Sequence, residues 1–191
     1  MISSKGPTKG ELKSEFKIAE RMIETIQDDP FCVFVLEGQK EVIVTAEFAG
    51  TMWKAKLDNL NPDRITDLKT VDCITKKHWD TEYGTYVNFV ESRRYVTQMA
   101  VYAELDRLKA GREDWLEVLI LAVSKEDPPD KEIISIDSGR IQMELEAVKE
   151  RMPRVLSVKN GLEAPVRCGK CRYCRETKRL TSVTHYMDLV V

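Results

Sequence analysis

Two aspartates and a lysine near the middle of the chain have the types and spacing that suit metal-dependent hydrolysis. Asp58 ends a stretch of strand-like alternation, and Asp67 and Lys69 lie on the next predicted strand, across a turn. Residues two apart on a strand point to the same face, and pairing of the hairpin would bring Asp58 alongside them. Two carboxylates that meet are tolerated when a cation lies between them, and oxygen ligands favour Mg²⁺ or Mn²⁺. A neighbouring lysine can orient or deprotonate a water and stabilise charge developing on a phosphate.

The same residues allow a plainer interpretation, a salt bridge on a solvated strand edge. An acidic residue two positions before a lysine also occurs at Glu11, Glu15 and Glu176. The second aspartate, nine residues earlier with a turn between, favours the catalytic interpretation. The apolar neighbours Ile65 and Leu68 indicate that the strand is anchored in a core.

Hydrophobic periodicity predicts the elements that position these residues. Apolar residues at three- and four-residue steps predict helices, and β-branched or alternating stretches predict strands. The expected order is a helix over 12–26, strands over 42–45, 53–58 and 64–70, a helix over 92–109, strands over 115–123 and 132–136, and a helix that Ser138 caps and Pro153 ends. A short apolar run at 31–36 follows the first helix. This order predicts the α/β class.

Length and composition limit the possible classes of protein. At 191 residues the chain has room for one domain with a small appendage. Hydrophobic residues at 42% exclude general disorder, and a net charge of −2 excludes a histone-like basic protein. No apolar run approaches the roughly 18 residues of a membrane helix, and the start lacks a secretion signal. We expect an intracellular protein with a flexible lead-in at 1–10, a main domain at 11–160 and a tail at 161–191.

Three of the five cysteines form the pattern C-x2-C-x2-C near the C-terminus; they are Cys168, Cys171 and Cys174. An odd number of cysteines without a signal peptide argues against a disulfide framework. The three thiols could bind a [4Fe–4S] cluster with Cys73 or Cys32 as a fourth ligand. They could also form a Cys₃His zinc site with His185, or remain reduced in a tight loop.

The segment around these cysteines is strongly basic, with six cationic residues against one acidic residue over 167–180. Such a patch could hold a phosphate backbone, or it could be a basic surface tail without a ligand. The cationic residues are Arg167, Lys170, Arg172, Arg175, Lys178 and Arg179.

The predicted helix over 92–109 carries a polar residue, Gln98, on an otherwise apolar face, flanked by Tyr95 and Tyr102. Tyrosines at this spacing fit core packing as well as ligand contacts. Gln98 fits a functional and a structural role equally.

Together these motifs resemble the PD-(D/E)XK nucleases. Trp53-Lys-Ala-Lys-Leu-Asp58, followed by Ile65-Thr-Asp67-Leu-Lys69-Thr70, resembles most the phage and prophage RecE-like (exonuclease VIII-like) exodeoxyribonucleases. Tyr95-x-x-Gln98-x-x-x-Tyr102 is similar to the Q-x-x-x-Y motif of the λ-exonuclease, RecB and RecE branch. The Arg-Cys-Gly-Lys-Cys-x-Tyr-Cys tail is similar to the C-terminal end of phage-encoded members, some relatives of which hold a [4Fe–4S] cluster there.

The resemblance implies a restriction-endonuclease-like core, with a mixed sheet of about five strands flanked by helices and a cysteine-rich basic tail. It implies a Mg²⁺-dependent nuclease, with Mn²⁺ as a substitute, that degrades linear duplex DNA from its ends in phage recombination. Asp58 and Asp67 would bind the metal, Lys69 would act on the nucleophilic water, and Gln98 would help to orient the site. The expected DNA contacts are Tyr95, Tyr102, Arg167, Lys170, Arg172 and Arg175.

The resemblance also implies a place and partners for the protein. A phage- or prophage-encoded member is expected in the cytoplasm of a bacterial host, as a homo-oligomer and beside a RecT-type single-strand annealing protein. His78 and Trp79 follow the catalytic strand in a loop that either faces DNA or is an ordinary exposed loop.

The sequence departs from the family pattern at the N-terminus. There a helix before the three strands usually supplies another acidic or histidine residue, and we expect that an upstream catalytic helix is missing from this chain. Glu20 and Glu24 of the first helix stand in no recognisable motif, and Glu41 and Glu47 are weaker substitutes. Two other functions therefore compete with the exonuclease: an inactive nuclease fold that binds DNA or serves assembly, and a metal-binding regulatory domain whose cysteine tail is the functional part.

Overall fold

The computed structural model describes residues 2, 9–10 and 12–188, apart from the side chain of Glu15. Most of the lead-in predicted at 1–10 lies outside these residues. The chain forms two compact units, Met1–Met152 and Pro153–Val191. Within the described part of the chain, no helix has the length and apolar character needed to cross a bilayer.

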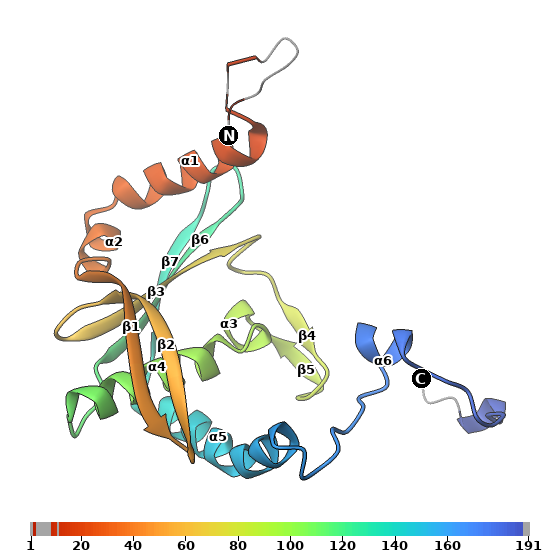
Figure 1. Cartoon of the computed structure of the whole chain (residues 1–191). Helices are drawn as coiled ribbons and strands as arrows, with labels where there is room; N and C mark the ends of the chain where they lie inside the picture. Colours follow the sequence, from red (N-terminus) through yellow and green to blue (C-terminus); the bar gives the residue numbers. More distant parts are fainter. Residues whose placement is uncertain (1, 3–8, 11, 189–191) are drawn as a thin grey trace. The chain divides into compact units, whose positions relative to one another are not determined.

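A five-stranded mixed sheet organises the first unit (Figure 1). Its order is β1-β2-β3-β6-β7, in which β3 and β6 run parallel and all other neighbours antiparallel. The strands are β1 (Gln39–Phe48), β2 (Thr51–Leu60), β3 (Arg64–Val71), β6 (Glu117–Ser124) and β7 (Lys131–Ile136). The predicted α/β fold with a mixed sheet of five strands is confirmed.

The inner strand β6 contributes side chains to two core clusters, one on each face of the sheet. Its side chains at 118, 120 and 122 join the larger cluster with α4 (Tyr95–Ala110) and α5 (Ser138–Lys159). Its side chains at 119, 121 and 123 join a smaller cluster with α1 (Ser14–Gln27) and α2 (Pro30–Val35). A strand buried on both faces has a nearly continuous apolar sequence, which is why the sequence predicted it correctly.

The larger cluster also fixes the direction of the candidate catalytic residues. Ile65 of β3 is buried in that cluster. Asp67 and Lys69 lie two and four residues later on the same strand, so their side chains face α4. The sheet thus presents both residues to the helix that carries Gln98.

The apolar run at 31–36 forms most of a short helix, α2. Asp29 begins it, because its carboxylate accepts the N–H groups of Phe31 and Cys32. Pro30 occupies the first helical turn, where its missing N–H costs nothing. The same Pro30 separates α2 from α1, which ends at Gln27.

Both predicted ends of the last long helix are wrong. Ser138 is the first residue of α5, and the carboxylate of Asp137 caps it by accepting the N–H of Arg140 at 2.9 Å. Pro153 lies inside the helix, which continues to Lys159. Gly161 follows two residues after the helix, and its φ of 74° suits a glycine that turns the chain away from the last turn. The glycine therefore provides the stop signal.

The segment after β3 is a hairpin and a short helix, where the sequence predicted a loop. His78 and Trp79 belong to β4 (His78–Asp80), which pairs with β5 (Thr85–Val87). Trp79 and Tyr86 lie opposite each other in this pair, with their ring centres 5.2 Å apart. This cross-strand contact explains why so short a hairpin forms. Next come α3 (Phe89–Ser92) and α4, so the helix predicted from Ser92 begins at Tyr95.

Candidate active site

The two aspartates meet where β2 and β3 separate. These strands pair over Asn59–Thr66 and Leu60–Ile65. Continuing this antiparallel register by one residue places Asp58 across from Asp67. Beyond that point β2 remains paired with β1, and β3 remains paired with β6. The two carboxylates therefore lie where the β2–β3 ladder ends.

The direction of the side chains along β2 changes at Asp58. Leu57 is buried in the larger cluster, whereas the Asn59 amide donates to the carbonyls of Val35 and Glu37 beside α2. Residues two apart on a flat strand would share one face, so the strand must twist at Asp58. The Asp58 carboxylate then accepts the backbone N–H of Leu68 at 3.2 Å, which ties β2 to β3 where their ladder ends.

Asp67 is almost completely buried, with 2% of its side chain exposed. Lys69 Nζ lies 2.6 Å from Oδ2. Among the described residues this ammonium is the polar partner of Oδ2, which accepts no further hydrogen bond. Burial raises the pKa of Asp67; Lys69 opposes this effect and Asp58 adds to it. The carboxylate is thus placed where a further cation would be favourable.

Lys69 is held between Asp67 and an aromatic ring. Its Nζ lies 4.5 Å from the centre of the Tyr95 ring, and 16% of its side chain is exposed. A cation over an aromatic face is stabilised by the ring quadrupole. The ammonium is therefore fixed in position, with part of its surface still open to solvent.

Gln98 links α4 to this pair. Its amide nitrogen lies 3.4 Å from Asp67 Oδ1 and donates to Tyr102 Oη at 2.9 Å. Tyr95 and Tyr102 also pack against the larger cluster. The structure thus brings together Asp58, Asp67, Lys69, Gln98, Tyr95 and Tyr102.

Three of the additional carboxylates named from the sequence, Glu41, Glu47 and Glu20, lie elsewhere. Glu41 falls opposite Asp58 in the β1–β2 register, with φ at 59°, but its carboxylate pairs with Lys56. Glu47 is six residues farther along β1, about 20 Å away along a strand. Glu20 is exposed on α1, which covers the opposite face of the sheet. Among the described residues no third carboxylate or imidazole joins Asp58 and Asp67 in a ligand cluster.

The pair nevertheless fits a small divalent cation. Two carboxylates converge, and one of their oxygens is buried without a hydrogen-bond donor other than Lys69 in the described part of the chain. Mg²⁺ is commonly held by one or two carboxylates together with waters and substrate phosphate oxygens. Asp58 and Asp67 would hold the ion, and the other positions would be left to solvent and substrate.

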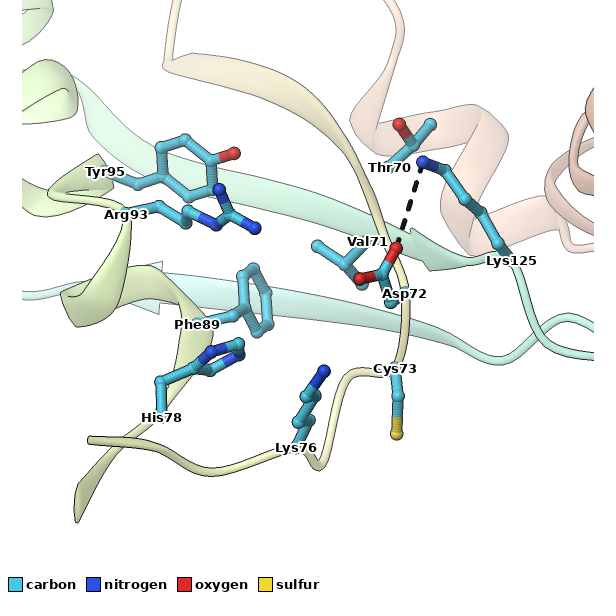
Figure 2. Close-up of a pocket in the computed structure, with 10 residues that line it drawn as sticks. All are labelled: Thr70, Val71, Asp72, Cys73, Lys76, His78, Phe89, Arg93, Tyr95 and Lys125. Atoms are coloured by element: carbon cyan, nitrogen blue, oxygen red, sulfur yellow. Dashed lines mark ion pairs between the residues drawn. The ribbon is translucent and has the colours of Figure 1, made fainter. Parts of the chain in front are cut away.

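A polar cavity of about 180 Å³ opens beside this site, at the end of β3 (Figure 2). Tyr95 lines the cavity and its ring also contacts Lys69, so one residue borders both the cavity and the site. Lys76, His78 and Arg93 line it as well. Asp72, on the same wall, is 4.0 Å from Lys125. The cavity is thus positively charged beside the carboxylates, as a phosphate-binding surface requires.

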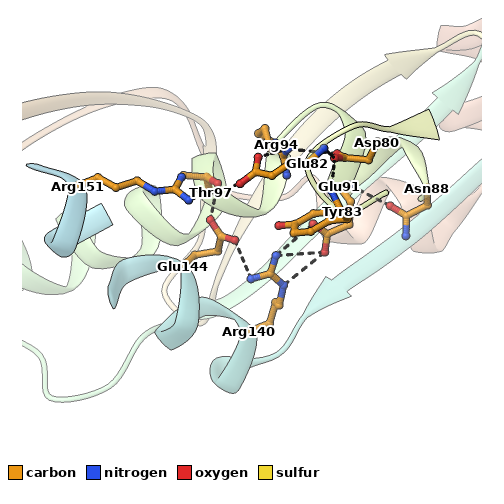
Figure 3. A network of polar contacts seen from close by, with 10 residues as sticks. All are labelled: Asp80, Glu82, Tyr83, Asn88, Glu91, Arg94, Thr97, Arg140, Glu144 and Arg151. Atoms are coloured by element: carbon orange, nitrogen blue, oxygen red, sulfur yellow. Dashed lines mark hydrogen bonds and ion pairs between the residues drawn. The ribbon is translucent and has the colours of Figure 1, made fainter. Parts of the chain in front are cut away.

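A network of ion pairs fixes the hairpin and helices around the cavity (Figure 3). Arg94 contacts Asp80 at 3.2 Å and Glu82 at 2.7 Å. Arg94 has φ at 56° and precedes the first residue of α4. Arg140 of α5 pairs with Glu91 of α3 and with Glu144. Sequence reasoning missed this network because its partners lie on separate elements and form no local motif.

The cysteine tail belongs to the second unit. The Sγ atoms of Cys168, Cys171 and Cys174 lie within 4.8 Å of one another. Backbone N–H groups of Cys171 and Lys170 lower the pKa of the Cys168 thiol to about 7. Of the proposed fourth ligands, Cys32 is buried in the smaller core cluster, Cys73 contacts Thr75, and the His185 imidazole accepts the N–H of Met187.

The basic residues of the tail are exposed, and two of them have local partners. Arg167 donates to Thr177 at 2.6 Å and lies over the ring of Tyr173. Arg172 pairs with Glu176 at 2.7 Å. Lys170 and Arg175 are also exposed. A nucleic-acid contact by these residues stays a prediction.

Comparison with known proteins agrees with this geometry. A family described as a PDDEXK-like domain of unknown function, DUF3799, matches residues 1–177. The chain belongs to this family. A crystal structure of a Eubacterium rectale protein, provisionally described as an exonuclease, is 39% identical and has a TM-score of 0.85, covering 94% of this chain and 67% of that chain.

Two further comparisons provide no additional relative of this PDDEXK-like chain. The crystal structure of SSO0001 aligns with 84% of this chain and 74% of that chain at 14% identity. Its TM-score of 0.30 is too low to indicate a shared fold. No curated protein matches the sequence. The predicted PD-(D/E)XK fold is thus confirmed, whereas nuclease activity and the divalent metal stay predictions at this point. The RecE-like branch, phage origin and recombination role stay predictions.

Proposed function

We propose that this chain is a Mg²⁺-dependent exodeoxyribonuclease of the phage recombination type, which degrades linear duplex DNA from its ends. The observation that carries the proposal is the junction of β2 and β3, where Asp58, Asp67 and Lys69 converge and Gln98 closes the site from α4. Its similarity to a protein provisionally described as an exonuclease, over 94% of this chain, supports the reaction class.

Each side chain of the site has a distinct task in phosphodiester hydrolysis. Asp58 and Asp67 would hold the metal ion, and a bound ion would supply Lewis-acid chemistry, activating a water and offsetting charge on the phosphate. Lys69 donates a hydrogen bond to the attacking water or to the phosphoryl oxygen on which charge develops. Asp67 and Tyr95 fix the Lys69 ammonium, so little reorientation is needed during the reaction.

Gln98 and the cavity position the other components. Gln98 contacts one Asp67 oxygen through its amide nitrogen, which limits rotation of that carboxylate. Lys76, His78 and Arg93 line the cavity beside Tyr95, and in this proposal they contact an adjacent phosphate of the bound strand. These cations orient the strand without reading its sequence.

The test is digestion of linear duplex DNA in Mg²⁺ and in Mn²⁺, with a covalently closed circle of the same sequence as substrate control. Linear DNA should be consumed and the circle should survive. Lys69→Ala should lose activity but still bind Mn²⁺, because the lysine is not a ligand. Lys69→Arg should also be poor, since the planar fork of a guanidinium does not match the single water or phosphoryl oxygen that the ammonium contacts.

Lys54→Ala is a matched control, because Lys54 is exposed on β2 and contacts none of the site residues described above. It should digest DNA like the unmodified chain. Cleavage of the closed circle would indicate an endonuclease. Intact linear DNA in both metals, together with tight duplex binding, would instead support the inactive DNA-binding module.

A further inference from the structure

The three cysteines of the tail lie at the spacing of ligands to one ion. Cys168 Sγ and Cys174 Sγ are 3.9 Å apart, and all three Sγ atoms lie within 4.8 Å of one another. With zinc–sulfur bonds of about 2.3 Å, two sulfurs of a tetrahedral site are about 3.8 Å apart. Cysteine sulfurs on three corners of a [4Fe–4S] cube lie about 6 Å apart. The observed spacing fits a single ion and is too small for the cube.

The backbone around the thiols also suits negatively charged sulfur. Cys171 donates its N–H to Cys168 Sγ at 3.3 Å, and Cys174 donates its N–H to Cys171 Sγ at 3.4 Å. Gly169, with φ at 72°, makes the turn that aims the first of these N–H groups. N–H donors to sulfur favour the thiolate, which is the form that binds metal.

An independent observation is the lack of an apolar core in this segment. Of the described residues after Pro153, Cys174 alone is buried. Leu162, Val166, Leu180 and Val183 are each at least 78% exposed. A folded turn of this size without a hydrophobic core normally depends on a cross-link or a structural metal. Here the three cysteines are free thiols, so a metal is the cross-link that the residues can supply.

We propose that Cys168, Cys171 and Cys174 bind one Zn²⁺ ion. Zinc is the ion that three clustered thiolates in tetrahedral geometry favour. Cys168 and Cys171 are exposed, so the fourth position faces solvent and a water fills it. The ion holds together the short helix α6 (Arg172–Glu176) and the turn before it, and so fixes the positions of Arg167, Lys170, Arg172 and Arg175.

The site is separate from Asp58 and Asp67 and does not depend on the proposed nuclease function. The purified full chain should carry one equivalent of zinc by elemental analysis, and Cys174→Ser should carry less than a tenth of that. Cys73→Ser, which changes a cysteine outside the cluster, should keep the zinc. Replacement of zinc by Co²⁺ should give the intense visible absorption of a tetrahedral thiolate site, and this absorption should be missing in Cys174→Ser.

A second readout follows the fold of the tail. Trypsin should cut after Arg172 and Arg175 at least tenfold faster in the chelated chain than in the zinc-bound chain, and zinc should restore protection. Asp67→Asn should keep its zinc whether or not the chain degrades DNA, so failure of one proposal is distinguishable from failure of the other. Iron with broad visible absorption, three freely alkylated thiols in the purified chain, or full zinc content in Cys174→Ser would overturn the proposal.

Discussion

Two buried carboxylates of the first unit, Asp67 and Glu104, are surrounded very differently. Glu104, with 6% of its side chain exposed, accepts Arg107 Nε at 2.8 Å, Arg107 Nη2 at 3.0 Å and Trp115 Nε1 at 2.8 Å. The bond to Arg107 lowers the pKa of Glu104. Asp67 is buried more deeply, yet it has one ion pair, with Lys69, and one amide contact at 3.4 Å, and burial raises its pKa.

This difference separates a carboxylate that stabilises the fold from one that serves a ligand. Every oxygen of Glu104 has a donor, so its negative charge is compensated by the protein itself. Asp67 leaves Oδ2 without a hydrogen-bond donor other than Lys69 in the described part of the chain, and its charge becomes favourable when a cation arrives. Incomplete compensation at a buried acid is thus a physical sign of a metal site.

The largest effect is expected for a substitution of Asp67, which should change nuclease activity but not stability. Asp67→Asn should lower nuclease activity by about 10³-fold, because the metal loses one of its two protein ligands. The free energy of unfolding should not fall, since the amide replaces a carboxylate whose charge is costly to bury. Digestion rates and urea denaturation measure the two quantities. Asp114→Asn, at an exposed aspartate, is the control, and a large loss of stability in Asp67→Asn would contradict the comparison.

Metal binding should stabilise the chain through Asp67 and not through Glu104. Mn²⁺ at one hundred times its Kd should raise the free energy of unfolding by about 2.7 kcal/mol. Glu104→Gln should show the same increase, and Asp67→Asn none. Denaturation with and without Mn²⁺ measures this. An equal increase in the free energy of unfolding of both variants would show that the ion binds somewhere other than at Asp67.

Glu104→Gln should destabilise the fold by about 2 kcal/mol at neutral pH, because it removes charge-assisted hydrogen bonds to a buried group. The folded-state pKa of Glu104 lies below its ordinary value of 4.5. Its stabilisation is therefore complete above that value and disappears as the pH falls through the folded-state pKa. The difference between variant and unmodified chain should shrink in acid. A difference that stays constant to low pH would show that the charge of Glu104 does not matter.

The smallest effect concerns the positioning of Asp67 by α4. Gln98→Ala should lower kcat by about tenfold and leave KM for DNA nearly unchanged, since Gln98 contacts the carboxylate rather than the strand. Tyr102→Phe removes only the acceptor of the second Gln98 hydrogen bond, so its loss should be about two- to threefold. A larger effect on KM than on kcat would mean that these residues bind DNA.

Local patterns were sufficient to predict much of the fold and the central part of the site. Alternation along β2 and β3 predicted the hairpin, and a two-residue step places Asp67 and Lys69 on one face. Helical spacing predicted the face that carries Gln98. These features depend on residues close in sequence, where periodicity is informative. The roles of these residues stay predictions until the variants are assayed.

Features that depend on distant partners could not be predicted in the same way. Arg94 pairs with Asp80 and Glu82 across a hairpin whose strands have three residues each, too short for a clear alternation. Glu104 looked like any helical glutamate, because Trp115 comes from a separate segment. Glu41 lies at the register position opposite Asp58, but its pairing with Lys56 is a tertiary outcome.

The narrow joint between β2 and β3 has a consequence for how metal affinity can change during evolution. Asp58 belongs to the β1–β2 hairpin, which pairs with β3 through two residue pairs. Few backbone hydrogen bonds therefore fix the distance between Asp58 and Asp67. The β1–β2 hairpin is supported instead by side chains such as Val44 and Leu57, which belong to the same core cluster as Leu105 of α4. Substitutions in this apolar layer shift Asp58 relative to Asp67 without touching either residue. Sequence changes in this apolar layer therefore also change the distance between the two carboxylates. Substitutions that restore this distance should accumulate in homologous chains along the α4-facing side of β1.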